Sequence, residues 1–296
     1  MSSQDSYSER NGASPADRSR RDFVALSAAA GLAASSGVVR GAEMKIVEEE
    51  VTITTPDGTC DAAFIHPASG AHPAVLVWTD VFGLRPSMRA IGKRMAEQGY
   101  AVLVPNPFYR TSKAPQFPDA STFDFAANRA QLAPLVGPLN KEGAAESDAK
   151  AYIAWLDTQK AVDKKKKIGT QGYCMGGPLV VKTAAAVPDR VGAGGSFHGG
   201  GLVTDQPSSP HLLASKINAH LYFAVASNDD QRQPDAKDKL KEAFGSKAEV
   251  EVYGECQHGW CVADMPKQPN GSPIYNKDEA DRAWTKLTAL YKANLV

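Results

Sequence analysis

The sequence has few cysteines and no excess charge of either sign, and both shortages narrow the class of protein. Four cysteines in 296 residues are too few to form a disulfide framework for a domain of this size. Lysine plus arginine equals aspartate plus glutamate at 33 each, so no net field favours nucleic acid or an anionic membrane. We therefore expect one large globular domain whose partner is a small molecule.

The chain also lacks an apolar run long enough to cross a bilayer. The most apolar N-terminal stretch, 25–34, is short and rich in Ala and Gly. It comes after Arg20 and Arg21, and this order resembles a bacterial twin-arginine export signal. The alternative is a plain N-terminal tail on a cytoplasmic protein, because no clear cleavage site stands out before Ala42.

An export signal at the N-terminus would divide the chain into two parts and would decide where the mature protein is found. Residues 1–43 are predicted to be a signal peptide with a flexible N-terminus, and residues 44–296 the folded domain. The twin-arginine export machinery is then a partner, and the mature chain starts near residues 34 to 43. We expect the mature protein in the periplasm or outside the cell, without stable insertion in a membrane.

After Met44 the pattern is that of an alternating α/β protein. The segment 74–78 is apolar throughout, as expected for a parallel strand buried on both faces. The segments 51–54 and 62–65 flank the turn signal at 56–58, which predicts an opening antiparallel hairpin. Further strands are predicted at 100–104, 168–172, 193–197, 221–226 and 250–253.

Helical patterns lie between these strands, at 88–98, at 142–157, from Pro178 onward and at 277–293. This alternation predicts a mostly parallel sheet covered by helices on both faces. The segment 106–140 is rich in Pro, Ser, Asn and Asp, and we expect it to cross the edge of the sheet and to form part of a substrate-site wall.

The strand at 168–172 runs directly into the sequence GYCMGG at 172–177, and a helix comes next. This is the G-x-nucleophile-x-G turn of α/β hydrolases, with Cys174 in place of the usual serine. The glycines two residues before and after are needed because the turn holds the nucleophile in a strained backbone conformation. The turn also directs the backbone N–H of Met175 toward a developing oxyanion. Taken alone, the motif also fits a buried structural cysteine.

The order of the polar residues beyond this turn favours the catalytic interpretation. The strand at 221–226 is followed by Asp229 and Asp230, and the strand at 250–253 by His258. Nucleophile, acid and base in this order, each after the carboxyl end of a strand, is the arrangement that α/β hydrolases use. We predict Asp229 as the acid, while Asp230 stays open as an alternative; the carboxylate without this role would cap a helix or face solvent.

The chain resembles the dienelactone hydrolase family over about residues 51–290. The motifs that carry the resemblance are GYCMGG at 172–177, PNPFYR at 105–110, SFHGG at 196–200 and the histidine at 258. The resemblance implies an α/β-hydrolase fold over the domain and hydrolysis of enol-lactones or activated esters without a metal or cofactor. It also implies that Cys174 attacks the carbonyl carbon, that His258 takes and returns the proton, and that Asp229 fixes the imidazole tautomer.

The resemblance also gives roles to the loop WTDVFG at 78–83. Relatives have a glutamate there that holds the resting thiol, and the next backbone N–H completes the oxyanion hole. Asp80 and the N–H of Val81 inherit these roles. Aspartate is one methylene shorter, so stabilisation of a turn is the alternative role for Asp80.

Several aromatic residues border these loops, and we expect them to wall an apolar pocket. For each of them a core position is the alternative. The aromatic residues are Trp78, Phe82, Phe108, Tyr109 and Trp260, and His198 is expected as a hydrogen-bonded wall residue beside them.

The substrate expectation depends on Arg110. Relatives that open dienelactone hold the substrate carboxylate with two arginines; Arg110 matches the first, and Val262 stands at the position of the second. With one of two bidentate anchors missing, we expect a hydrolase of small esters or lactones with at most a modest preference for an acidic group. A salt bridge to a loop carboxylate is the alternative role of Arg110.

Two other classes of protein compete with a hydrolase. Cys256, His258 and Cys261 lie within six residues, which is the kind of cluster that zinc favours, but a fourth ligand with comparable spacing is missing. In an oxidising compartment the same two cysteines could instead form a disulfide. A secreted binding protein on a hydrolase scaffold would be preferred if a member of the triad were lost, and none is.

Overall fold

A computed structural model describes residues 44–295, so the predicted export signal lies outside the described residues. One eight-stranded sheet runs through this part of the chain in the order β1-β2-β4-β3-β5-β6-β7-β8. Pairing is antiparallel for β1 with β2 and for β2 with β4, and parallel from β4 through β8. The strands are β1 Ile46–Thr55, β2 Gly58–Pro67, β3 Ala74–Trp78, β4 Ala101–Pro105, β5 Ile168–Tyr173, β6 Val191–Phe197, β7 His220–Ala226 and β8 Ala248–Tyr253.

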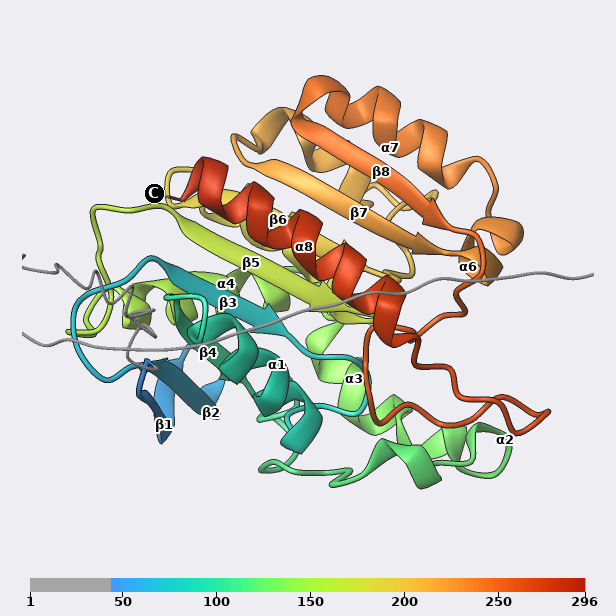
Figure 1. Cartoon of the computed structure of the whole chain (residues 1–296), viewed down its shortest axis with the longest axis horizontal. Helices are drawn as coiled ribbons and strands as arrows, with labels where there is room; N and C mark the ends of the chain where they lie inside the picture. Colours follow the sequence, from blue (N-terminus) through green and yellow to red (C-terminus); the bar gives the residue numbers. More distant parts are fainter. Residues whose placement is uncertain (1–43, 296) are drawn as a thin grey trace, which may run out of the picture. The chain divides into compact units, whose positions relative to one another are not determined.

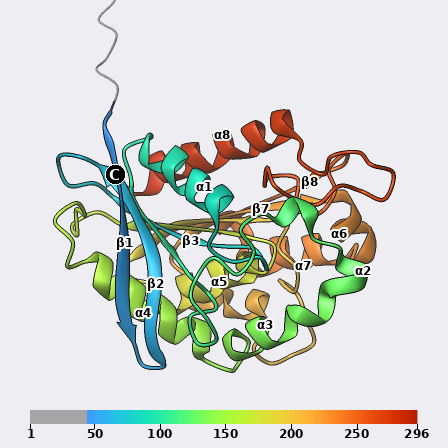
Figure 2. The same ribbon diagram turned by 90° about the horizontal axis from the view of Figure 1, so that it is seen from below.

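Helices cover both faces of this sheet (Figures 1 and 2). Helices α1 (Pro86–Ala96) and α8 (Lys277–Asn294) pack on one face, and α4 (Ala144–Leu156), α5 (Gly176–Ala186) and α7 (Ala236–Phe244) on the other. The shorter helical segments are η1 Ala120–Thr122, α2 Phe125–Asn128, η2 Arg129–Gln131, α3 Ala133–Leu139, η3 Pro210–Lys216, α6 Ser227–Arg232 and η4 Gly245–Lys247. The predicted α/β-hydrolase architecture and opening hairpin are confirmed.

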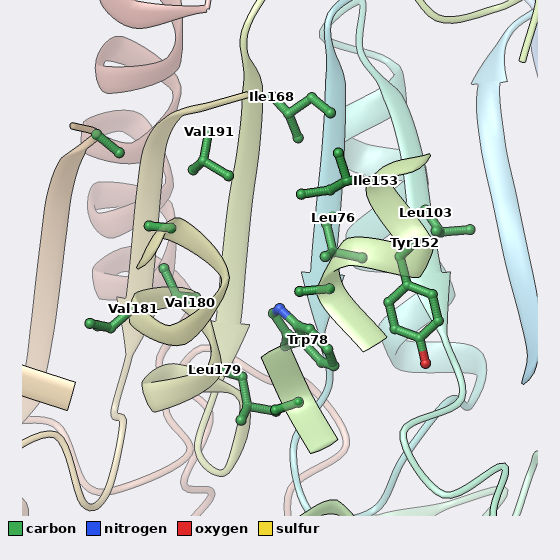
Figure 3. Packing of buried hydrophobic residues seen from close by; sticks show 14 of the residues in the cluster. Leu76, Trp78, Leu103, Tyr152, Ile153, Ile168, Leu179, Val180, Val181 and Val191 are labelled. Carbon is green, nitrogen blue, oxygen red and sulfur yellow. The ribbon is translucent and has the colours of Figure 1, made fainter. Parts of the chain in front are cut away.

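The apolar run of β3 explains why two helical layers form. Because side chains alternate across a strand, Leu76 and Trp78 enter one core and Val75 and Val77 the other. Figure 3 shows Leu76 and Trp78 beside side chains of α4 and α5. The indole of Trp78 is 1% exposed and donates a hydrogen bond to Thr183 Oγ1 at 2.9 Å. Trp78 therefore belongs to the core and not to a pocket wall.

The parallel strands bring their carboxyl ends to one edge of the sheet, as their arrowheads show in Figure 1. The loops after β3, β4, β5, β6, β7 and β8 begin there, and these loops carry the residues singled out in the sequence. One local difference is that Asp229 lies in the first turn of the short helix α6 rather than in a loop. Within residues 44–295 no helix combines the length and apolar character needed to cross a membrane.

Candidate active site

The turn from β5 into α5 holds Cys174 in a backbone conformation that few side chains adopt. Its φ is 52°, in the left-handed region, and the residue is partly exposed. A Cβ at Gly172 would lie 2.1 Å from the carbonyl oxygen of Gly176, and one at Gly176 would lie 2.5 Å from the carbonyl oxygen of Trp78. Both glycines are therefore required by close backbone approach, as the motif predicts.

A histidine and a carboxylate lie beside this cysteine. The Nδ1 atom of His258 is 2.7 Å from Oδ2 of Asp229, and the backbone N–H of His258 donates to Asn228 Oδ1 at 2.8 Å. Asp230 instead pairs with Lys237 at 2.7 Å. Of the two neighbouring aspartates, Asp229 is thus the one that orients the imidazole, and Asp230 is held on the outside of α6.

Opposing effects act on the pKa of His258. Burial lowers the pKa of the imidazole, whereas the hydrogen bond to Asp229 and the neighbouring Cys174 thiol raise it, with a net result of about 10. With Nδ1 committed to Asp229, the Nε2 atom is the one free to exchange a proton with a thiol or with a substrate. The arrangement can therefore stabilise a thiolate beside an imidazolium.

Two backbone N–H groups lie where an oxyanion could be bound. Met175 caps the N-terminus of α5, whose dipole places positive charge at this end, and Val81 lies just beyond the carboxyl end of β3. Neither N–H donates a hydrogen bond to another residue in the part of the chain that the structure describes. Both are available as donors to a ligand.

The surroundings of Asp80 differ from the expectation that it holds the resting thiol. Both of its carboxylate oxygens accept hydrogen bonds from Arg85, at 2.7 and 2.9 Å, and Oδ1 also accepts the backbone N–H of Phe82 at 2.9 Å. Arg85 is itself buried and reaches Asp264 through two further bonds of 2.7 and 2.8 Å. Burial raises the pKa of Asp80, and Arg85 opposes that shift. Asp80 stabilises the loop after β3, which is the alternative role that its shorter side chain suggests.

The structure places His198 next to the backbone of Cys174 and not on the wall of the cavity in front of it. The residue is fully buried, has a positive φ of 41°, and accepts the backbone N–H of Cys174 on Nδ1 at 3.1 Å. Its ring packs on that of His258, with 4.9 Å between centroids. Burial and the neighbouring His258 lower the pKa of His198 well below 6.5, so its ring is neutral.

The prediction that Arg110 and Tyr109 bind substrate is not supported by their positions. The guanidinium of Arg110 is held by Asp57 on one side and by Asp148 on the other, with distances from 2.6 to 2.8 Å. The hydroxyl of Tyr109 lies between Thr55 and Asp148, at 2.7 and 2.8 Å. Four of its five N–H donors are directed at these two carboxylates, so Arg110 ties the hairpin to α4 and its charge is already paired twice.

The predicted aromatic wall is only partly present. Phe82 lines a cavity next to Cys174, as predicted. Trp260 is fully buried and stacks on Tyr253 at 4.9 Å between centroids, and Phe108 is 1% exposed. Both side chains are buried, Trp260 against Tyr253 of β8 and the ring of Phe108 beside Gly83 in the loop after β3. A position next to the site loops in the sequence does not reveal these directions.

A cavity of about 550 Å³ opens in front of Cys174. The segment 106–140 contributes Phe125, Ala126 and Arg129 to it, so this excursion does form a wall next to the cysteine, as predicted. The remaining lining residues are Asp80, Val81, Phe82, Cys174, Arg232, His258 and Met265. Sequence reasoning missed Asn228, Arg129 and Arg232; only Asn228 had a signal, because it precedes Asp229 at the end of a strand.

The sequence leaves two alternatives open for the cysteines near His258, a disulfide and a metal site. All four cysteines have free thiols, including Cys256 and Cys261. Between residues 44 and 295 no group of three His, Cys, Asp or Glu side chains is placed so that it could hold a metal ion.

The fold and the site together define an α/β hydrolase. The sequence profile of the dienelactone hydrolase family matches residues 60–295, and the chain belongs to that family. A relative from Synechocystis is 28% identical over 237 residues, which are 77% of this chain and 89% of the relative. The carboxymethylenebutenolidase of Rhodococcus opacus is 26% identical and is matched over 74% of this chain and 83% of its own.

Solved structures share the same fold. A dienelactone hydrolase-like promiscuous phosphotriesterase from metagenomic libraries superposes with a TM-score of 0.65 at 21% identity, over 85% of this chain and 99% of the other. Membership of the family makes the chain a hydrolase of the ester or lactone class.

Proposed function

We propose that the protein hydrolyses small carboxylic esters or lactones with Cys174 as nucleophile, His258 as acid and base, and Asp229 as the group that orients His258. The observation that carries this proposal is the 2.7 Å contact of Asp229 with His258 Nδ1, next to a cysteine on the turn between β5 and α5. It leaves Nε2 of His258 for proton transfer with the thiol.

The proposed reaction has two halves. The Cys174 thiolate forms a bond to the carbonyl carbon, and the carbonyl electrons move to an oxyanion that the N–H groups of Met175 and Val81 stabilise. The carbon–oxygen bond to the alcohol breaks, and His258 gives that oxygen its proton. Water then loses a proton to His258 and attacks the thioester, which releases the acid and returns the thiol.

The substrate class depends on the charges that remain free. Arg110 is occupied by Asp57 and Asp148, and Val262 is buried and apolar. Neither position is therefore available to bind a substrate carboxylate, the role that two arginines have in the relatives that open dienelactone. We therefore propose a broad preference for small esters or lactones and at most a modest gain from an acidic group.

Esterase assays on cysteine variants test the catalytic proposal. Cys174→Ala should abolish turnover of p-nitrophenyl acetate, and Cys174→Ser should be poor because a site that ionises a thiol deprotonates an alcohol less well. Cys261→Ala is the matched control and should stay active and sensitive to iodoacetamide. Near-wild-type activity in pure Cys174→Ala would refute the proposal.

We also propose export through the twin-arginine route, on the basis of Arg20, Arg21 and the apolar stretch 25–34. Fractionation of cells that express the full-length chain should find the protein in the periplasm, and replacement of both arginines by lysine should retain it in the cytoplasm. Cytoplasmic location of both forms would contradict this proposal.

A further inference from the structure

His258 lies on the walls of two cavities. The first is the cavity of about 550 Å³ that contains Cys174 and Val81. The second, of about 600 Å³, contains neither of them and shares with the first only Phe125, Ala126 and His258. The two spaces are therefore neighbours at His258, and Phe125 and Ala126 of α2 form part of the wall of both.

We propose that the second cavity binds the alcohol half of an ester, while the first cavity binds the acyl half. This assignment rests on the proposed function. In the tetrahedral intermediate the sulfur of Cys174 and the oxyanion at Val81 fix two substituents of the carbon inside the first cavity. The departing oxygen must reach Nε2 of His258, because Nδ1 is taken by Asp229. Its carbon chain then extends past His258, which is where the second cavity opens.

The lining of the second cavity indicates what kind of alcohol fits. Six of its lining residues are apolar: Phe123, Phe125, Ala126, Pro266, Pro269 and Ile274. The ring of Phe123 packs edge-on against Phe82 and Phe125, each at 5.0 Å between centroids. Oδ1 of Asp124 accepts the backbone N–H groups of Ala126 and Ala127, so this residue caps α2. The other lining residues are polar: Asn228, Gln257, Lys267 and Gln268, besides His258 and Asp124. An aryl or arylalkyl group is the ligand that the apolar part of this surface binds best.

Two separate cavities also affect the choice between esters and lactones. In a lactone the acyl carbon and the departing oxygen belong to one ring, and a small ring cannot fill both spaces. An open-chain ester of an aryl-bearing alcohol buries apolar surface on each side of His258. The enzyme should therefore prefer such esters to small lactones.

A series of acetate esters tests the assignment, since the acyl group and the thioester stay constant. We expect kcat/KM to rise about tenfold or more from ethyl to benzyl to 2-naphthylmethyl acetate, which corresponds to about 1.4 kcal/mol of added apolar contact. The increase should appear in the acylation rate and not in the hydrolysis of the acetyl-enzyme.

Variants of the second cavity locate the effect. Phe123→Ala should remove most of the preference for naphthylmethyl over ethyl acetate. Ile274→Trp fills the cavity and should have the same effect, so it provides the test if Phe123→Ala fails to fold. Phe117→Leu is the matched control, because Phe117 contacts Phe123 at 5.3 Å between centroids but lines neither cavity; it should keep the preference.

The outcomes separate this assignment from the proposed function. Equal kcat/KM for all three esters, or a preference that survives both cavity variants, would overturn the alcohol site even if Cys174→Ala is inactive. Activity that survives Cys174→Ala would overturn the proposed function instead.

Discussion

At the scale of single residues, two side chains have backbone conformations normally reserved for glycine. Cys174 and His198 are the non-glycine residues with positive φ in the described part of the chain, at 52° and 41°. Each such conformation costs about 1–3 kcal/mol and persists only where the surroundings enforce it. Here the two residues are linked, because the N–H of Cys174 donates to His198 Nδ1. If Cys174 is the nucleophile, as we propose, this link makes His198 its positioning residue.

A pair of substitutions tests the role of His198. His198→Ala should lower kcat roughly tenfold with a smaller change in KM, because the N–H of Cys174 keeps only the carbonyl oxygen of Phe197, at 3.0 Å, as an acceptor and the turn can relax. His198→Asn should retain more activity, since asparagine tolerates a positive φ and its amide oxygen can accept the same N–H. Steady-state kinetics and near-UV circular dichroism measure the two effects. Equal activity of the alanine and asparagine variants would show that the contact does not position Cys174.

The pKa of His258 predicts a pH-dependent contribution to stability. Its value rises from 6.5 to about 10 on folding, so the folded state favours the imidazolium. The resulting stabilisation is fully present below about pH 6.5 and is lost as the pH rises through about 10. The hydrogen bond to Asp229 is the first of the effects that raise this pKa, and Asp229→Asn removes the carboxylate. The wild type should therefore be more stable than the variant at low pH, and this difference in free energy of unfolding should shrink as the pH rises from about 6.5 to about 10. Urea titrations at intermediate pH measure it, and a difference that stays constant with pH would contradict the assignment.

At the scale of elements, the turn between β5 and α5 depends on the absence of side chains. A methyl group at Gly176 would lie 2.5 Å from one carbonyl oxygen of β3 and 2.7 Å from that of Thr79. Gly176→Ala must therefore displace backbone, and a displacement near 1 Å lowers the rate by roughly 100-fold. Gly200→Ala is the control, because no atom lies within 4 Å of its added Cβ. If both variants are equally active, the close packing of the turn is not needed for activity.

Arg110 belongs to the element scale, because it joins three segments of chain. It links Asp57 in the hairpin turn to the fully buried Asp148 on α4. Arg110→Met would leave a buried carboxylate without its charged partner, which costs about 3–5 kcal/mol. The ratio of kcat/KM for an acidic ester to that for its neutral analogue should not change.

A surface arginine provides the comparison for this prediction. Arg94 pairs with Asp281 where both side chains are more than a third exposed, so Arg94→Met should cost less. Urea denaturation gives both values. If Arg110→Met is as stable as the wild type but loses a preference for acidic esters, Arg110 binds the substrate and the structural role is wrong.

The elements show which features the sequence can predict. Strands such as β3 are recognisable because burial on both faces requires an uninterrupted apolar run. The turn at Cys174 is recognisable because close backbone approach requires glycines on both sides of the cysteine. The pairings of Asp80 with Arg85 and of Arg110 with Asp148 are not encoded in a local pattern. They depend on which of several carboxylates lies within reach once the strands are assembled, so the sequence could not show that both side chains are already paired.

At the scale of the whole molecule, the order of the sheet brings distant residues together. Cys174, Asp229 and His258 come after β5, β7 and β8, and parallel strands end at one edge. The predicted order of nucleophile, acid and base therefore defines their meeting place without any knowledge of contacts. The two cavities could not be predicted in this way, because the segment that divides them, 123–126, has no strand or helix pattern that fixes its path.

The central claim is that Cys174 carries the acyl group during turnover, and acid-quench mass spectrometry of the enzyme mixed with p-nitrophenyl acetate tests it most directly. We predict one acetyl group on the quenched wild-type protein, located on Cys174 by peptide mapping and removed by hydroxylamine, with none on Cys174→Ala. An acetyl group on another residue that forms and decays at the rate of turnover would contradict this claim.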